Sequence, residues 1–249
     1  TKRLQLDFLA QSAAILQAQK VMANLLRVQS DWGWKGLIPW LRLRPTLQPD
    51  SEAIALIDNA NLSHSLAVFA GALFRANLHG TLLKTLYDNI VSFLANQREG
   101  YLAFVDSRFG VFRATYDKGS QQFDSYADRF GSEVRATIPF LVTYFGLPAS
   151  VWDNLIHTVS RYLTQKGRMV ETFSAFDGGG FQYFWPLLRS PEEALPKIGE
   201  MLLNALLIHS DFREKKGLPG FVSASSLPEG GYSGRLFHAG RWMREWSRC

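Results

Sequence analysis

The sequence predicts an all-α protein of one domain, in which short β-hairpins occupy some of the connections between helices. Three features of the 249 residues predict this class. Apolar residues recur at helical spacing along most of the chain. Capping residues, glycines and prolines stand at the ends of these segments, and patterns with a period of two are confined to short stretches. Hydrophobic residues make up 47% of the chain, which is enough for a buried core, so we do not expect disorder.

In the N-terminal half, a period of 3.6 residues predicts helices on both sides of a loop. Residues 37–50 contain Pro39, Pro45 and Pro49, which exclude a long helix or strand there. Thr81 follows a glycine, and the two together provide a helix stop and an N-cap. The expected helices cover residues 4–28, from 51 or 61 to 75, and 81–96.

The period changes to two over residues 101–116, where two apolar segments flank a turn and predict a β-hairpin. A second short hairpin is expected at residues 167–173. Ser190 and Pro191 then provide the N-cap and the first position of a long helix. The remaining expected helices cover residues 130–146, 149–164, an aromatic segment that ends at 189, and 191–216, and residues 217–234 form a loop rich in glycine and serine.

Composition narrows the classes of function. Cys249 is the one cysteine, which excludes a disulfide framework and a cysteine-based metal site. The histidines are dispersed, so we expect no metal, and no nucleotide-binding glycine motif is present, so we expect no cofactor. The net charge is +5, but basic and acidic residues are interspersed, which favours a mixed solvated surface over a nucleic-acid partner.

No apolar run reaches the roughly 18 residues that a membrane span needs. The first residues lead into an amphipathic helix rather than an apolar signal segment. Two locations fit these observations, the bacterial cytoplasm and the periplasm.

Residues 175–188 hold the most informative motif, an acid and three glycines followed by an amide and several aromatic rings. Glycines let the backbone approach a ligand closely. Asp177 and Gln182 offer hydrogen bonds, while Tyr183 and Trp185 offer flat apolar faces. Sugar rings need both features, because their C–H faces stack and their hydroxyls form hydrogen bonds. The alternative is a tight turn that enters a buried aromatic helix.

Two further segments carry carboxylates. Asp128 and Glu133 stand at the start of an expected helix, where a carboxylate can face a cavity, although Glu133 can equally cap its own helix. Arg135 lies on another side of that helix and does not simply neutralise Glu133. Glu229 is the one carboxylate of the glycine- and serine-rich loop, which also contains Tyr232. Such a loop often carries a site on a helical scaffold, but a solvated turn explains it as well.

Five blocks of sequence together resemble the bacterial glucoamylase-like domain family, the helical-barrel domains of endo-β-1,2-glucanases and cyclic β-1,2-glucan synthases. Residues 131–136 (Gly-Ser-Glu-Val-Arg-Ala) are similar to an ala-ser-glu-ala-arg segment of that family, and residues 177–188 parallel its ser-gly-thr-met-phe-glu-tyr-leu-met-pro-leu segment. The other blocks are residues 57–62, 100–104 and 223–232. The resemblance covers about residues 55–235 and implies an (α/α) toroid with a central sugar-binding cleft.

The resemblance also implies that carboxylates hydrolyse or transfer glucosyl linkages. The synthase-like members carry glutamates where this chain has Gln182 and Ala224. The hydrolase-like branch lacks both acids as well, so the departure does not exclude catalysis. Gln cannot ionise and Ala has no proton to move, so this chain has either lost these acids or uses others.

We therefore predict a glycoside hydrolase that acts on a β-glucan or a related oligosaccharide. Glu133 is the expected general acid, with Asp128, Asp177 or Glu229 as the base or the residue that positions water. The residues expected to bind sugar are Asn61, Arg135, Gln182, Tyr183, Trp185 and Tyr232. One alternative is a non-catalytic glycan-binding domain on the same scaffold. The other is a polysaccharide lyase, for which the net charge of +5 suits an acidic sugar polymer.

The toroid of the resembling family needs more helices than the sequence predicts, so we expect an incomplete ring. Residues 235–249 are rich in tryptophan and arginine and form an atypical tail, although a true C-terminal helix is the alternative. In an incomplete ring, the helices near residues 1–28 and 191–216 would carry exposed apolar surface. Self-association of the chain is expected in that case.

Overall fold

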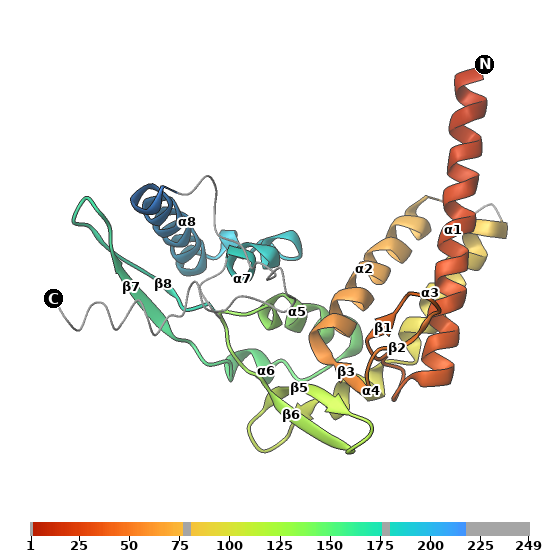
Figure 1. Ribbon diagram of the computed structural model, residues 1–249, viewed down its shortest axis with the longest axis horizontal. Coiled ribbons are helices and arrows are strands. Elements are labelled where there is room, and N and C mark those ends of the chain that lie inside the picture. The colour runs from red at the N-terminus through yellow and green to blue at the C-terminus, as the bar shows by residue number, and fades with distance from the viewer. Residues whose placement is uncertain (1, 77–80, 176–179, 218–249) are drawn as a thin grey trace. The chain divides into compact units, whose positions relative to one another are not determined.

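The computed structural model describes residues 2–76, 81–175 and 180–217, which form a mostly helical fold with small sheets (Figure 1). The contacts divide the chain into two compact units. The first comprises Thr1–Ala127 with Phe140–Val151, and the second comprises Asp128–Pro139 with Trp152–Cys249. Among the described helices, none is long and apolar enough to cross a membrane. The expectation of a mainly helical fold is confirmed.

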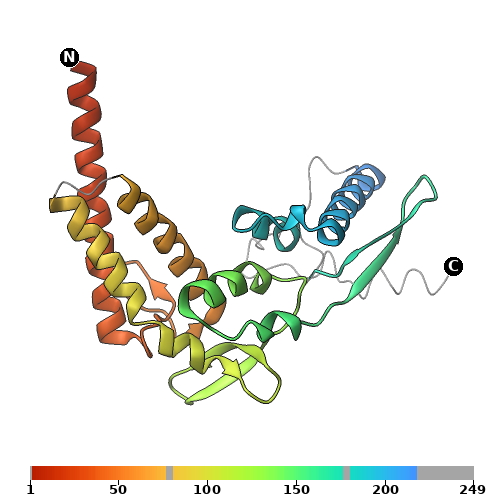
Figure 2. The same cartoon turned by 180° about the vertical axis from the view of Figure 1, so that it is seen from behind.

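Three long helices build the first unit, and all three match expected segments. They are α1 (Lys2–Trp32), α2 (Leu56–Arg75) and α3 (Thr81–Ala95). They lie side by side in both views of the molecule (Figures 1 and 2). Their shared core contains residues with little or no exposed surface, namely Met22, Val28, Leu73, Leu86, Ile90, Phe93 and Leu94. Burial of such side chains is the main stabilising term for a helix whose apolar positions follow the 3.6-residue period.

The end of α1 meets the end of α3 backbone to backbone. Gly36 has a φ of +82°, and a Cβ at this position would lie 2.0 Å from the carbonyl oxygen of Asn96, so only glycine fits. The Gln29 side-chain amide donates hydrogen bonds to the carbonyl oxygens of Gly36, at 2.7 Å, and Phe93, at 2.9 Å. These contacts fix the turn that follows α1.

The first unit also contains a four-stranded antiparallel sheet. Its central strand is β5 (Val111–Asp117), which pairs with β6 (Gln122–Ala127) along one edge and with β3 (Ala53–Ala55) and β4 (Val105–Asp106) along the other. A separate two-stranded hairpin, β1 (Leu41–Arg42) and β2 (Gln48–Pro49), lies in the proline-rich segment.

The hairpin predicted over residues 101–116 begins later than expected. Residues 101–103 belong to the short helix α4 (Arg98–Ala103), and only β4 and β5 form the hairpin. Tyr101 and Phe104 are both fully buried. Their spacing of three residues marks one face of a helical turn, which the sequence pattern of alternating apolar residues does not separate from a strand. The Tyr101 hydroxyl lies 2.8 Å from that of Ser63 in α2.

The prediction of one helix over residues 149–164 is wrong. The structure has the short helix α6 (Ser150–Asp153) and then β7 (Val159–Leu163), which pairs with β8 (Met169–Phe173). The partner strand falls within the hairpin expected at 167–173, so the second hairpin exists but begins earlier. Tyr162 is buried on β7, and its hydroxyl donates a hydrogen bond to Asp211 at 2.7 Å, which ties the strand to the helix that carries Asp211.

The remaining helices among the described residues match expected segments with shifted boundaries. They are α5 (Val134–Phe145), α7 (Gly180–Phe184), the 3₁₀ turns η2 (Trp185–Leu188) and η3 (Glu192–Ala194), and α8 (Pro196–Lys216). The long helix begins at Pro196 rather than Pro191, because η3 lies between them. Proline therefore does occupy the first helical position, but it is the second proline of the segment.

Candidate functional site

The turn that leads into α5 carries Glu133 and is pressed against the chain that follows β8. A Cβ at Gly131 would lie 1.8 Å from the carbonyl oxygen of Ser174, so the two backbones touch. The Ser132 hydroxyl donates to the carbonyl oxygen of Arg129 at 2.7 Å and accepts from the backbone N–H of Val134 at 3.4 Å. Ser132 therefore contributes to the cap at the start of α5. Glu133 directly precedes the helix, and its side chain is half-buried.

Asp128 lies on the same approach to α5. Its carbonyl oxygen accepts a hydrogen bond from the N–H of Ile156 at 2.7 Å, and the Phe130 N–H donates to the carbonyl of Ile156 at 3.1 Å. These bonds join the approach to the segment before β7. The Asp128 carboxylate is only 20% exposed and lies 3.6 Å from Nε of Arg129, which is 60% exposed. Both predicted carboxylates of this segment are thus held on one short, well-bonded stretch of backbone.

The aromatic motif forms α7 and η2. The rings of Phe181 and Trp185 stack with centroids 5.4 Å apart, and the Arg189 guanidinium lies 5.0 Å from the Trp185 ring centroid. The Tyr183 hydroxyl donates to the carbonyl oxygen of Phe173 at 2.9 Å, and burial raises the pKa of that phenol. Within the described residues, Oε1 of Gln182 and Nε1 of Trp185 are buried without a hydrogen-bond partner. This segment is thus part core and part half-buried aromatic surface.

Arg135 is fully buried and connects the two segments. Its Nε donates to Oε2 of Glu192 at 2.8 Å, and its two terminal nitrogens donate to the carbonyl oxygens of Gln182, at 3.0 Å, and Tyr183, at 2.6 Å. Burial lowers the pKa of the guanidinium, and the Glu192 carboxylate opposes this effect. A side chain enclosed in this way is not placed to touch a sugar, so the geometry favours a different role for Arg135 from the one expected.

Glu192 is the functional candidate that the sequence analysis missed. It is almost fully buried in η3, and its second oxygen, Oε1, has no hydrogen-bond partner among the described residues. The signal was Arg135 itself, a single charge within an apolar helix. A buried charge requires an opposite partner, but nothing in the local pattern says which distant acid supplies it.

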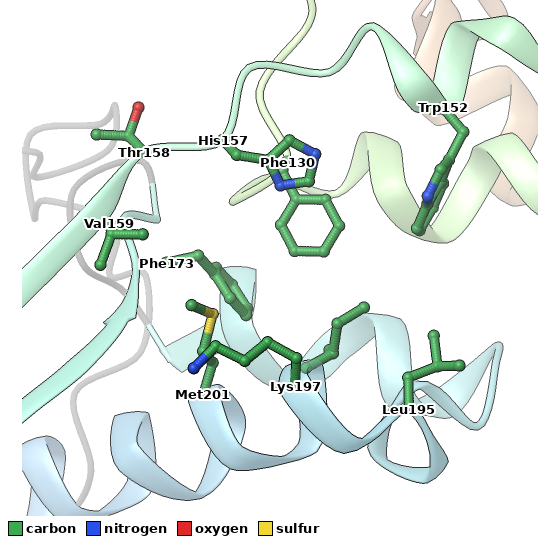
Figure 3. Close-up of a pocket in the computed structure, with 10 residues that line it drawn as sticks. Phe130, Trp152, His157, Thr158, Val159, Phe173, Leu195, Lys197 and Met201 are labelled. Atoms are coloured by element: carbon green, nitrogen blue, oxygen red, sulfur yellow. The ribbon is translucent and has the colours of Figure 1, made fainter.

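A hollow of about 270 Å³ lies beside the Asp128–Glu133 approach and is mostly apolar (Figure 3). Phe130 forms part of its wall, stacks on His157 at 4.5 Å between centroids, and meets Trp152 edge to face at 5.7 Å. Lys197 and His157 contribute nitrogen atoms. The other lining residues are Thr158, Val159, Phe173, Leu195, Ile198 and Met201. This hollow has room for about one ring and offers aromatic faces to it.

The structure brings some predicted site residues together and leaves others apart. Arg135 joins the segment of Asp128 and Glu133 to the segment of Gln182, Tyr183 and Trp185 through the contacts given above. Asn61 lies on α2 in the first unit. Asp177, Glu229 and Tyr232 lie outside the described residues. Over residues 2–76, 81–175 and 180–217, no group of three or more metal-binding side chains is present.

Comparison with known proteins places the fold. No protein-family model and no curated protein sequence matches the chain. The structure is similar to that of an endo-β-1,2-glucanase from Talaromyces funiculosus in complex with sophorose, with a TM-score of 0.72, 15% sequence identity, and coverage of 89% of this chain and 50% of that one. A glutamate-to-glutamine variant of that enzyme with β-1,2-glucan gives a TM-score of 0.72 and 14% identity at the same coverages.

This similarity confirms the expected relationship of fold to an endo-β-1,2-glucanase. The chain spans about half the length of these solved structures. At 14–15% identity the comparison concerns the fold alone. The resemblance to the glucoamylase-like family and the identity of the site residues stay predictions.

Proposed function

We propose that the chain forms part of an (α/α) toroid and that it is a glycoside hydrolase that acts on a β-glucan. The observation that carries this proposal is the fold shared with an endo-β-1,2-glucanase over 89% of the chain. Fold alone does not determine chemistry. The proposal therefore also draws on the two carboxyl groups that approach α5 and on the aromatic segment that Arg135 ties to them.

Glu133 acts in this proposal as the general acid. Hydrolysis of a glycosidic bond needs one carboxyl group that donates a proton and a second that handles water or the sugar carbon. As the bond between C1 and the leaving oxygen breaks, the Glu133 proton passes to that oxygen. Asp128 accepts a proton from the water whose oxygen bonds to C1. Asp177 and Glu229, which lie outside the described residues, are the alternative partners for Glu133.

Substrate binding is assigned to the aromatic segment and to the hollow. Trp185, whose ring packs against Phe181 and Arg189, offers its remaining exposed surface to a sugar ring, and Gln182 hydrogen-bonds to hydroxyls. Asn61 and Tyr232 are the further candidates for sugar contact from the sequence, whereas Tyr183 is buried and its hydroxyl donates to Phe173. The hollow beside Phe130 and Trp152 accepts one glucosyl ring, because its size and aromatic walls suit a single stacked ring.

A linkage screen tests the proposal. The full chain is incubated with glucans of different β-linkages, and newly formed reducing ends are counted. We expect release from β-1,2-glucan. Binding of a glucan, measured by calorimetry, without release of reducing ends would replace the hydrolase by a non-catalytic glycan-binding domain. An unsaturated product from an acidic polysaccharide, detected by its ultraviolet absorbance, would replace it by a lyase.

A further inference from the structure

The junction of α7 and η2 leaves two backbone carbonyls without their usual donors. In an α-helix the carbonyl of residue i accepts from the N–H of residue i+4, and in a 3₁₀ turn it accepts from residue i+3. Pro186 has no N–H. It is the i+4 residue for Gln182 and the i+3 residue for Tyr183. In the regular patterns of α7 and η2, the N–H of Trp185 is taken by Phe181 and that of Leu187 by Phe184. The carbonyls of Gln182 and Tyr183 are then left for a donor from outside the segment, and a buried carbonyl without a partner is costly.

Arg135 supplies both donors from α5. Its terminal nitrogens lie 3.0 Å from the carbonyl oxygen of Gln182 and 2.6 Å from that of Tyr183. The guanidinium presents its N–H groups in a rigid plane, so one side chain can serve two neighbouring carbonyls at once. A lysine carries a single ammonium on a flexible stem and does not match this arrangement.

Glu192 and two aromatic rings fix the orientation of the guanidinium. The carboxylate lies 2.8 Å from Nε, and the guanidinium carbon lies 4.5 Å from the Phe173 ring centroid and 5.6 Å from that of Phe130. A buried ion pair of this kind often stabilises a fold no better than apolar side chains of similar volume. Stability alone is therefore a weak reason for the pair to be here, and its contacts with the two carbonyls offer a better one.

We propose that Arg135, oriented by Glu192, is a positioning residue that fixes Gln182 and Trp185 relative to Glu133. Arg135 stands two residues after Glu133 on the chain, and its contacts end on the backbone of the segment that carries the sugar-binding side chains. This inference rests on the proposed function for its catalytic meaning. The ordering of residues 180–188 by Arg135 is a structural statement that does not depend on any substrate.

The test replaces the whole ion pair, so that no buried charge is left alone. In the variant Arg135→Met/Glu192→Leu the fold should persist, because apolar residues replace the pair, while the two carbonyls lose their donors. We expect amide hydrogen exchange over residues 180–188 to accelerate about tenfold or more, with little change in the rest of the second unit. On β-glucan, the KM should rise about tenfold, while kcat falls less, because the sugar-binding side chains lose their fixed positions.

A matched control is the Arg161 and Glu171 pair between β7 and β8. Its Nε–Oε1 distance is 2.7 Å, but the arginine is largely exposed. Arg161→Met/Glu171→Leu removes an ion pair of the same type from the same unit. It should leave hydrogen exchange over residues 180–188 unchanged.

A second variant guards against loss of the fold. Arg135→Lys keeps the charge beside Glu192 but cannot serve both carbonyls, so it should also accelerate exchange over residues 180–188. Adding Pro186→Ala to either variant restores one N–H donor and should slow that exchange again.

Three outcomes overturn the inference. They are exchange that rises evenly through the second unit in the double variant, unchanged exchange over residues 180–188 in Arg135→Lys, and no response to Pro186→Ala. If the wild-type chain neither binds nor cleaves any glucan, the proposed function fails. The exchange measurements still decide whether Arg135 orders the segment.

Discussion

At the scale of single residues, the two carboxylates before α5 have different surroundings. Asp128 has an arginine neighbour at 3.6 Å, and Glu133 directly precedes the helix on a turn whose backbone touches Ser174. Two carboxyl groups in unlike environments are the usual basis for separate acid and base roles. The roles assigned to them can be tested one substitution at a time.

Glu133→Gln should lower turnover on a cleaved glucan by about two to four orders of magnitude, because the amide cannot donate the proton that the leaving oxygen needs. The melting temperature should stay nearly unchanged, since Ser132 hydrogen-bonds at the start of the helix. Steady-state kinetics and thermal melts check this prediction. Normal turnover would remove Glu133 from the mechanism, and a collapsed fold would assign it a capping role. Asp128→Asn is the companion variant.

His209 should make the stability of the second unit depend on pH. Its ring lies against Tyr183 and Phe184 with centroid distances of 5.8 and 6.3 Å, and burial lowers the pKa of the imidazole. As pH falls below about 6.5, the unfolded chain binds the proton first. The contribution to the free energy of unfolding is therefore present above that pH and is lost as pH falls through the folded pKa.

Urea unfolding of the wild type and of His209→Gln, on both sides of about pH 6.5, measures this contribution. The wild type should lose more stability than the variant on acidification. Equal losses in the two proteins would assign the pH dependence to other groups.

At the scale of elements, the turn before α5 depends on a glycine. Gly131→Ala should destabilise the protein by about 1–3 kcal/mol, because the new methyl group would overlap the Ser174 carbonyl and force the backbones apart. Gly71→Ala is the matched control. Gly71 lies in α2 with open space around it, so alanine should stabilise the helix by about 0.5–1 kcal/mol. Denaturant unfolding compares both variants with the wild type. A Gly131→Ala variant that is as stable as the wild type would contradict the contact assigned to Gly131.

The long elements were predictable from sequence because their signals are local. The helices α1, α2 and α3 carry a 3.6-residue period. The helix α8 was expected from a proline at its first position, although that proline is Pro196 and not Pro191. The strand β7 was not predictable, because its conformation depends on pairing with β8. The short helix α4 was misassigned because a few apolar residues fit both periods.

In the candidate site, too, features with a local sequence signal were predictable, and features that depend on distant residues were not. Local patterns placed Asp128 and Glu133 next to a helix start and placed the aromatic motif on a helix. In the structure Glu133 directly precedes α5, Asp128 lies six residues before Val134, and the motif forms α7 and the 3₁₀ turn η2. The contacts of Arg135 could not be predicted from the sequence, because its partners lie 47, 48 and 57 residues away. Burial and long-range pairing are properties of the folded chain, and a single sequence does not contain them in readable form.

At the scale of the whole molecule, both units carry exposed apolar side chains on helices where the sequence analysis expected them. On α8 these are Leu203, which is 68% exposed, with Leu206 and Leu207 beside it. On α1 they are Leu16 and Val21. Residues at positions i, i+3 and i+4 lie on one face of a helix, so the three leucines of α8 form a continuous apolar strip.

This leucine strip should make the chain self-associate at high concentration, because contiguous apolar surface is favourably buried. In sedimentation velocity, the double variant Leu203→Gln/Leu207→Gln should contain more monomer and less self-associated protein than the wild type. Leu43→Gln is the control, since that leucine is 72% exposed but lies outside α8. A wild-type chain that stays monomeric over the whole concentration range would contradict the prediction.

The buried ion pair between Arg135 and Glu192 also has a consequence for synthesis. The two residues are 57 positions apart, so at about 5–20 residues per second the ribosome adds Glu192 roughly 3–11 s after Arg135. Through that interval the nascent guanidinium has no carboxylate to meet it and is best accommodated in water. The first turns of α5 would then enter their core late, and a ribosome stalled before Glu192 should hold this part of the chain open to chaperones.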